Sequence, residues 1–105
     1  MIAAEVSLRA PIAVPVEVRA DGRRAFRLAA AIGEDGVRLE TALPFEAGRL
    51  VEARLQLPDG TPLALPARLA GHDDDPADEL LFVEPPAEFR RLIHQYVLHR
   101  LELPA

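Results

Sequence analysis

Cysteine, tryptophan and lysine are absent from this chain of 105 residues. Without cysteine the chain forms neither disulfides nor thiolate-ligated metal sites, which is compatible with a reducing compartment, and we expect a cytoplasmic location. With one tyrosine and four phenylalanines, the hydrophobic core has to be built mainly from aliphatic side chains. All 12 basic residues are arginine, so any basic site presents planar guanidinium groups, which bind anions in a bidentate manner.

Long apolar runs and an excess of positive charge are also missing. No stretch of about 18 apolar residues is present, and no signal-peptide pattern occurs, so we expect no membrane insertion. The formal net charge of −5 argues against nucleic-acid binding, because sequence-independent binding requires the neutralisation of many phosphates. A length of 105 residues is typical of one domain, and we predict a single domain over residues 1–105.

Residues that could perform catalysis or bind a metal are few and scattered. Ser7 is the only serine, and no base accompanies it near the N-terminus. His72 precedes an acidic run, whereas His94 and His99 are five residues apart, about 140° around a helix, and share no ligand face. The acidic run, residues 73–79, lacks the glycine and distant glutamate of an EF-hand loop. We therefore predict neither a catalytic residue nor a metal site.

Alternation of apolar residues predicts short β-strands in the first half of the chain. Every second residue of the segment 14–18 is valine, and Asp21-Gly22 then supplies a hairpin turn. On the returning strand, the residues that we expect to face the core are Phe26, Leu28, Ala30 and Ile32. Asp35-Gly36 predicts a second turn, because glycine adopts positive φ at no steric cost. A third strand is expected over residues 37–41.

The second half of the chain contains the clearest hairpin. Residues 51–57 and 63–69 alternate in the same way and are joined by Pro58-Asp-Gly60. Pro62 and Pro66 lack a backbone N–H, so they predict an edge or bulge of the second strand rather than a central position. Residues 80–83 are wholly apolar, which predicts a short strand buried on both faces.

After Pro85-Pro86 the apolar period becomes helical and predicts an amphipathic helix over about residues 86–101. The residues of its apolar stripe are Phe89, Leu92, Ile93, Tyr96, Val97 and Leu101. Short strands joined by Gly, Pro and Asp turns, without strand–helix alternation, indicate an all-β protein. We expect a small antiparallel barrel or sandwich over about residues 10–84, closed by the helix.

Four local features of this pattern resemble the PilZ domain family. They are the entry segment 9–18, the turn segment 33–39, the hairpin 48–60, and the segment 81–84 that leads into 89–92. The resemblance runs from about Arg9 to Leu101. It implies a small six-stranded antiparallel β-barrel with a C-terminal α-helix and no catalytic activity.

The resemblance also identifies ligand-binding side chains that this chain lacks. Members that bind the bacterial second messenger cyclic di-GMP carry R-x-x-x-R before the first strand and (D/N)-x-S-x-x-G at the turn. Glu5 replaces the first arginine and Arg9 matches the second. At the turn, Ala31 replaces the acid or amide, Gly33 replaces the serine, and Gly36 matches. Loss of about 4 kcal/mol of binding free energy weakens binding roughly a thousandfold, so we predict no useful affinity for cyclic di-GMP and no cofactor.

An alternative is that cyclic di-GMP is still bound through a rearranged site. The cofactor-binding residues of this alternative are Arg9, Gly33 and Gly36. Arg23, Arg24 or Arg27 would then substitute for the missing groups, although these arginines fall in the first hairpin rather than before it.

The resemblance implies a protein-interaction adaptor of a bacterial motility, pilus or second-messenger pathway. Leu98 and Leu103 lie outside the apolar stripe of the helix, where a monomer exposes them. An isolated exposed leucine needs no partner, so chance exposure is one explanation. The other is that the helix docks on a protein partner or on a second copy in a homodimer. The predicted partner-binding residues are His94, Leu98 and Leu101.

Overall fold

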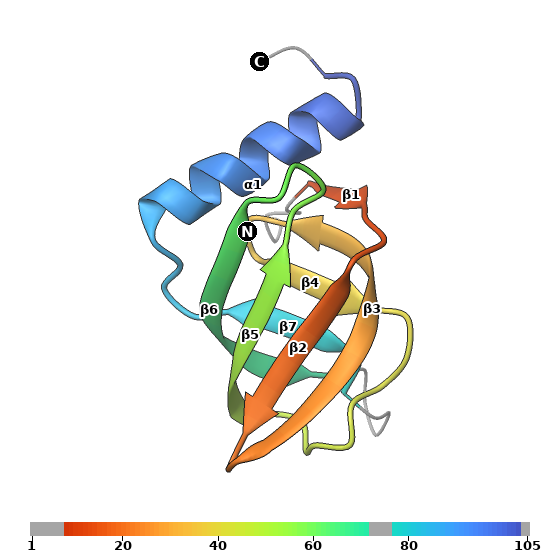
Figure 1. Cartoon of the computed structure of the whole chain (residues 1–105), viewed down its shortest axis with the longest axis vertical. Helices are drawn as coiled ribbons and strands as arrows, with labels where there is room; N and C mark the ends of the chain where they lie inside the picture. Colours follow the sequence, from red (N-terminus) through yellow and green to blue (C-terminus); the bar gives the residue numbers. More distant parts are fainter. Residues whose placement is uncertain (1–7, 72–76, 104–105) are drawn as a thin grey trace, which may run out of the picture.

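A computed structural model describes residues 8–71 and 77–103 as seven strands followed by one helix (Figure 1). The elements are β1 (Arg9–Pro11), β2 (Pro15–Ala20), β3 (Arg23–Gly33), β4 (Gly36–Leu39), β5 (Leu50–Gln56), β6 (Pro62–Ala70), β7 (Glu79–Phe82) and α1 (Ala87–Arg100). Glu5, Ser7, His72 and residues 73–76 lie outside the described residues, so the predictions that concern them stay predictions.

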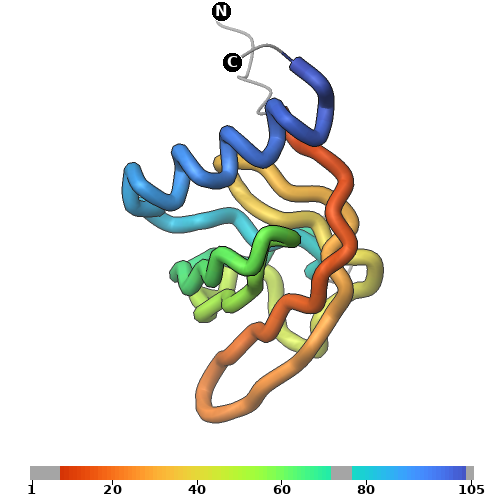
Figure 2. The backbone as a smooth tube through the Cα atoms, turned by 45° about the horizontal axis from the view of Figure 1, so that its top comes forward, coloured from red at the N-terminus to blue at the C-terminus, as the bar shows by residue number. Residues whose placement is uncertain are grey.

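Six of the described strands close into an antiparallel barrel. The strands follow the order β3, β2, β5, β6, β7 and β4, and β4 pairs again with β3. The short strand β1 pairs with the end of β3, beside this ring. The helix α1 lies across one end of the barrel, next to β1 (Figure 2). The predicted six-stranded barrel with a C-terminal helix is confirmed, and β1 is an additional strand.

The first hairpin is a two-residue turn, as predicted. Asp21 and Gly22 both have positive φ, 51° and 74°, and Ala20 pairs with Arg23 across the turn. This geometry matches the right-handed twist of the strands that it joins. It fixes the register of β2 against β3 along their whole shared length.

Phe26 and Leu28 face solvent, contrary to our prediction that they point into the core. Their exposed fractions are 58% and 41%, whereas Ala25 and Ala29 are buried. The register shifts in the β3–β4 pairing just after Ala29, and such a bulge reverses the side of the sheet on which later residues lie. Ile32 is therefore buried as predicted, although it is an even-numbered residue like the outward-facing Phe26 and Leu28.

The hairpin of β5 and β6 also agrees with the prediction. The two strands pair from Leu50–Arg68 to Gln56–Pro62, and the Asp59 side chain accepts a 2.9 Å hydrogen bond from the backbone N–H of Thr61 within the turn. Only the end of β6, from Ala67 onward, pairs with β7. The segment from Pro62 to Leu65 is thus an edge, and Pro66 lies where the contact with β7 begins, since its carbonyl oxygen accepts a 2.9 Å hydrogen bond from Val83.

The strand β7 is buried on one face only, which corrects the prediction of a strand buried on both. Leu80 is fully buried, whereas Leu81 is 39% exposed. The reason is that no other described element covers the outer face of the barrel at β7, because the helix contacts β1 and β3 instead.

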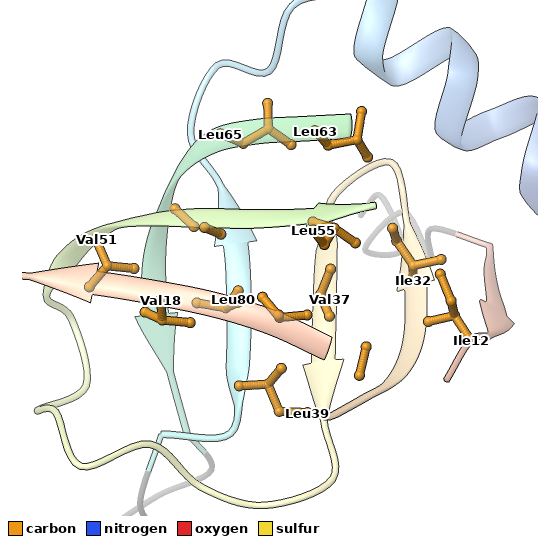
Figure 3. Close-up of a cluster of buried hydrophobic side chains, with 14 of the residues drawn as sticks. Ile12, Val18, Ile32, Val37, Leu39, Val51, Leu55, Leu63, Leu65 and Leu80 are labelled. Carbon is orange, nitrogen blue, oxygen red and sulfur yellow. The ribbon is translucent and has the colours of Figure 1, made fainter. Parts of the chain in front are cut away.

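The helix begins at Ala87 and ends at Arg100, within a residue of the prediction. Its buried residues are Ile93 and Val97, and the Tyr96 hydroxyl donates a 2.9 Å hydrogen bond to the carbonyl oxygen of Pro11. The core beneath it is aliphatic, as predicted (Figure 3). Within the described part of the chain, no helix is long and apolar enough to span a membrane.

Candidate functional site

The turn between β3 and β4 occupies the position of the ligand-binding motif in the family that the sequence resembles. Gly33 pairs with Gly36, which leaves Glu34 and Asp35 as the two turn residues. We predicted that Gly36 adopts positive φ, and this is wrong, because its φ lies outside the left-handed region. Glycine is required there for a close approach instead, since a Cβ at position 36 would overlap the carbonyl oxygen of Leu80 on β7.

Gly33 also packs closely, against β1 and the residue that precedes it. A Cβ at this position would lie 2.5 Å from the carbonyl oxygen of Leu8 and 2.8 Å from Cγ of Arg9. Real Cβ atoms do not approach backbone oxygen so closely, so a serine at position 33 would require β1 to move. The close packing of β1 in this structure therefore depends on glycine, rather than the motif serine, at position 33.

Arg9 is held by carboxylates from two other elements. Its Nε and Nη2 donate to Asp35 in the turn, both at 3.2 Å, and its Nη1 lies 2.6 Å from Oε1 of Glu79 at the start of β7. Burial disfavours the charged Arg9 guanidinium, but the hydrogen bonds to Asp35 and Glu79 outweigh that effect and raise its pKa. The Arg9 side chain is only 21% exposed, and two carboxylates of the protein itself balance its positive charge.

The other turn residue, Glu34, connects the turn to the helix. Its carboxylate lies 2.9 Å from Nδ1 of His94 and 3.9 Å from Nε of Arg90. Asp35 and Glu34 thus reach in different directions, one toward β1 and one toward α1. The turn, β1, β7 and α1 are joined by ion pairs at the place where a ligand-binding member would hold an anionic nucleotide.

An open hollow of about 350 Å³ lies beside these ion pairs. It is lined by Arg9, Ala10, Pro11, Ala30, Ala31 and Arg38. Ala31 faces Arg38 across the β3–β4 pair, but the methyl group of Ala31 offers no acceptor for a guanine edge. The hollow therefore retains arginine side chains and lacks the side chains that read a base.

The structure does not bring Arg23, Arg24 and Arg27 together with Arg9. Strand β3 begins at Arg23 and ends beside Arg9, and its 11 residues span roughly 35 Å at about 3.3 Å per residue. Arg27 is nearer, yet its Nε donates to the carbonyl oxygen of Ala42 at 2.9 Å. The replacement of the missing motif side chains by these arginines has no geometric support.

The three residues predicted to bind a partner have different environments. Leu101 is half-buried and packs against the core, whereas Leu98 is half-buried at the edge of the helix. His94 is exposed but paired with Glu34. The helix therefore presents a mostly polar outer surface. The barrel exposes large apolar side chains that the sequence reasoning missed: Phe26, Leu28, Leu50 and Leu81.

No cluster of three or more histidine, aspartate or glutamate side chains is placed to hold a metal ion within residues 8–71 and 77–103. His94 and His99 project from α1 without a common ligand position. The charged groups that converge on the turn form arginine–carboxylate and histidine–carboxylate pairs, and this arrangement stabilises a junction between elements.

Comparison with known proteins gives a family and two structural neighbours. A family model described as "PilZ domain" matches residues 7–99, and no curated protein matches the sequence. The inhibitor of motility MotI/DgrA of Bacillus subtilis has a TM-score of 0.81 at 19% identity, over 96% of this chain and 53% of MotI/DgrA. The PilZ domain of CeSA from a cellulose-synthesizing bacterium has a TM-score of 0.62 at 23% identity, over 90% of this chain and 97% of that domain. The chain thus spans about half the length of MotI/DgrA.

Proposed function

The chain belongs to the PilZ domain family, and from that premise we propose that it is a non-catalytic signalling adaptor that acts through protein contacts and does not bind cyclic di-GMP with useful affinity. We place it in the cytoplasm, in a bacterial motility, pilus or second-messenger pathway. The description of its structural neighbour MotI/DgrA as an inhibitor of motility supports the motility assignment.

The observation that carries the proposal is the pairing of Arg9 with Asp35 and Glu79. A phosphate that bound Arg9 would have to displace both carboxylates. These carboxylates would then remain beside the phosphate and repel its negative charge. The single motif arginine that this chain retains is therefore satisfied internally, and its transfer to a ligand is opposed by two nearby charges.

The remaining motif positions support the same conclusion. Ala31 and Gly33 provide no side-chain hydrogen bond to a guanine, and each charge-assisted hydrogen bond that is missing is worth about 1.5 to 3 kcal/mol. Two such hydrogen bonds together correspond to a decrease in affinity of roughly a hundredfold or more. The internal pairing of Arg9 adds to this decrease.

Isothermal titration calorimetry with cyclic di-GMP at physiological salt tests the proposal. We expect no saturable heat with the wild-type protein. Saturable binding tighter than about 10 μM would contradict the proposal and favour the alternative, a cyclic di-GMP effector that uses Arg9. In that case Arg9→Ala should abolish binding, whereas Arg91→Ala, on the outer surface of α1, should leave it unchanged.

A second variant tests whether the carboxylates of Asp35 and Glu79 prevent nucleotide binding. The double substitution Asp35→Asn with Glu79→Gln keeps the size of both side chains and removes both charges that hold Arg9. If internal pairing suppresses nucleotide binding, this variant should bind cyclic di-GMP more tightly than the wild type. Equal absence of binding in both proteins would assign the loss of affinity to the other departures from the motif, Glu5, Ala31 and Gly33, instead.

A further inference from the structure

An open apolar groove lies on the outer face of the barrel, and none of its lining residues belongs to the hollow beside Arg9. We call it the outer groove, and its volume is about 660 Å³. Its lining comes from β2, β3, β5, β6 and the segments next to them: Val14, Pro15, Glu17, Phe26, Arg54, Leu55, Gln56, Leu57, Pro62, Leu63 and Ala64. In Figure 1, β2 and β5 run side by side on this face of the barrel.

The groove exists because the outward side chains of β6 are short. Pro62, Ala64 and Pro66 are the outward residues in the first half of that strand, and none of them extends over the sheet. On the other side, the two-residue turn of the first hairpin forces Phe26 outward. Phe26 is 58% exposed, and the neighbouring Leu28 is 41% exposed. An aromatic ring beside a shallow apolar floor is a feature of protein interaction sites.

One exposed arginine, Arg54, lines the groove, and two more, Arg19 and Arg24, lie next to it in ion pairs with the lining residue Glu17. Arg19, Arg24 and Arg54 are 42%, 60% and 49% exposed, and they face two carboxylates, Glu17 and Glu52. Glu17 is only 16% exposed, and the hydrogen bond from Arg19 lowers its pKa, so it stays ionised beneath the arginines. The three arginines outnumber the two carboxylates, so this group of side chains is net positive in a chain whose net charge is −5.

The guanidinium groups retain donors for a partner. The ion pair of Arg54 with Glu52 uses its Nε at 2.6 Å, and that of Arg19 with Glu17 uses its Nε at 3.0 Å. The terminal nitrogens of both arginines make no hydrogen bond within the part of the chain that the structure describes. Guanidinium groups oriented by one carboxylate in this way are well placed to bind a second carboxylate.

The exposed edge of β6 does not offer a route for strand addition. The N–H of Leu69 points to β5, so the period of two along a strand directs residues 62, 64 and 66 away from β5. Two of these three residues are prolines, which have no N–H, and the carbonyl oxygen of Pro66 already accepts a hydrogen bond from Val83. The edge of β6 is therefore unsuited to strand addition, which leaves the face of the sheet as the available surface.

We propose that the outer groove binds an acidic segment of a partner protein, which places a large apolar side chain beside Phe26 and pairs its carboxylates with Arg54 and the neighbouring arginines. This inference deepens, and rests on, the proposed role as an adaptor that acts through protein contacts. A symmetric dimer through the same face would bring the same arginines of two copies together, and like-charge contact disfavours that arrangement.

The experiment uses a phage-displayed library of random peptides, selected against the purified full chain. We expect the enriched peptides to combine acidic residues with Phe, Tyr, Trp or Leu. Synthetic copies of these peptides should bind at least about tenfold more weakly to Phe26→Ala and to Arg54→Glu. The matched control is Leu81→Ala, which removes an exposed leucine from a different strand and should leave affinity unchanged.

Exchange of the charges on the peptide and on Arg54 tests whether the two groups form a pair. A peptide in which one acidic residue is replaced by lysine should bind Arg54→Glu better than it binds the wild type. Binding of the original acidic peptides should also weaken as ionic strength rises, because these charges are exposed to solvent. Thermal unfolding of each variant distinguishes a change at the groove from a failure to fold.

Several outcomes would overturn the inference. Selection of no peptides, selection of peptides without acidic residues, or equal affinity for wild type and Phe26→Ala would each do so. A Phe26-dependent dimer in sedimentation equilibrium, or Phe26-dependent binding to vesicles of phosphatidylglycerol, would assign the groove to a second copy or to a membrane. Failure of the proposed function appears separately, as saturable cyclic di-GMP binding that Phe26→Ala does not alter.

Discussion

Arg9 is held by ion pairs within the protein. Its guanidinium joins β1 to the β3–β4 turn and to β7 through Asp35 and Glu79. We expect Arg9→Ala to lower the free energy of unfolding by about 1 to 2 kcal/mol, because it removes both pairs and leaves two carboxylates close together. Urea denaturation measures this change.

Arg91→Ala is the control for the removal of an arginine. Arg91 is exposed on α1 and forms no ion pair with any residue in 8–71 or 77–103. Its substitution should change the free energy of unfolding by less than about 0.5 kcal/mol. Equal stabilities of the two variants would show that the Arg9 pairs contribute nothing measurable.

Gly36 is required by packing and not by its backbone conformation. A Cβ there would overlap the carbonyl oxygen of Leu80, so Gly36→Ala has to separate β4 from β7. We expect a decrease of about 2 to 4 kcal/mol in the free energy of unfolding. Gly22→Ala should cause a decrease of only about 1 to 2 kcal/mol, because Gly22 has positive φ but open space around it. The reverse order in thermal or urea unfolding would contradict this assignment.

At the level of elements, the sequence contains enough information to predict which residues in the first half of β3 face the core. Asp21-Gly22 predicts a two-residue turn, and that turn pairs Val18 with Ala25. Since directly paired residues of neighbouring strands share a face, Ala25 points inward with Val18. Phe26 must then point outward with Glu17, its own pairing partner. The apolar alternation alone favoured Phe26 as a core residue because Ala25 is the weaker hydrophobic signal.

Two other features of the structure, the bulge in β3 and the contact of Arg9 with Glu79, have no signal in the local sequence. The bulge after Ala29 falls in a run of three alanines, where the two possible phases look alike in hydrophobicity. The candidate site shows the same limit: Arg9, Gly33 and Gly36 are identified by the family motif, whereas the partner Glu79 is 70 positions from Arg9 in the sequence. Only closure of the barrel brings them together, and no spacing rule predicts that contact.

Two fully buried side chains of the helix α1 pack against the barrel. Ile93 and Val97 are 0% and 1% exposed. We expect Ile93→Ala to lower the free energy of unfolding by about 2 to 4 kcal/mol, because it reduces apolar burial and leaves a cavity behind. Gln95→Ala, on the exposed face, is the control and should have little effect. Comparable decreases in both variants would mean that the helix does not depend on this apolar packing.

At the scale of the whole molecule, the chain has the barrel and helix of the PilZ family. Ion pairs within the protein connect β1, β7 and α1 to the β3–β4 turn, where the ligand-binding motif of the family lies. Restoring the motif by Ala31→Asn with Gly33→Ser should therefore not restore cyclic di-GMP binding. A serine Cβ at position 33 would lie 2.5 Å from the carbonyl oxygen of Leu8, so β1 would have to move and strain its pairs with Asp35 and Glu79.

We expect this double variant to be less stable than the wild type by about 2 kcal/mol or more and to give no saturable heat with the nucleotide. Ala31→Asn alone is the control, because it restores one motif residue on the open hollow without the clash at β1. Nucleotide binding by the double variant at unchanged stability would show that β1 moves freely, and would weaken the structural interpretation of Arg9.

Tyr96 provides the molecule with a built-in optical reporter. It is the only tyrosine, and the chain has no tryptophan to mask its emission. Its hydroxyl donates to the carbonyl oxygen of Pro11, at the contact between α1 and β1. The ultraviolet fluorescence of the unmodified protein therefore reports on the docking of the helix against β1, and a stopped-flow or temperature-jump trace can follow that docking without any attached dye.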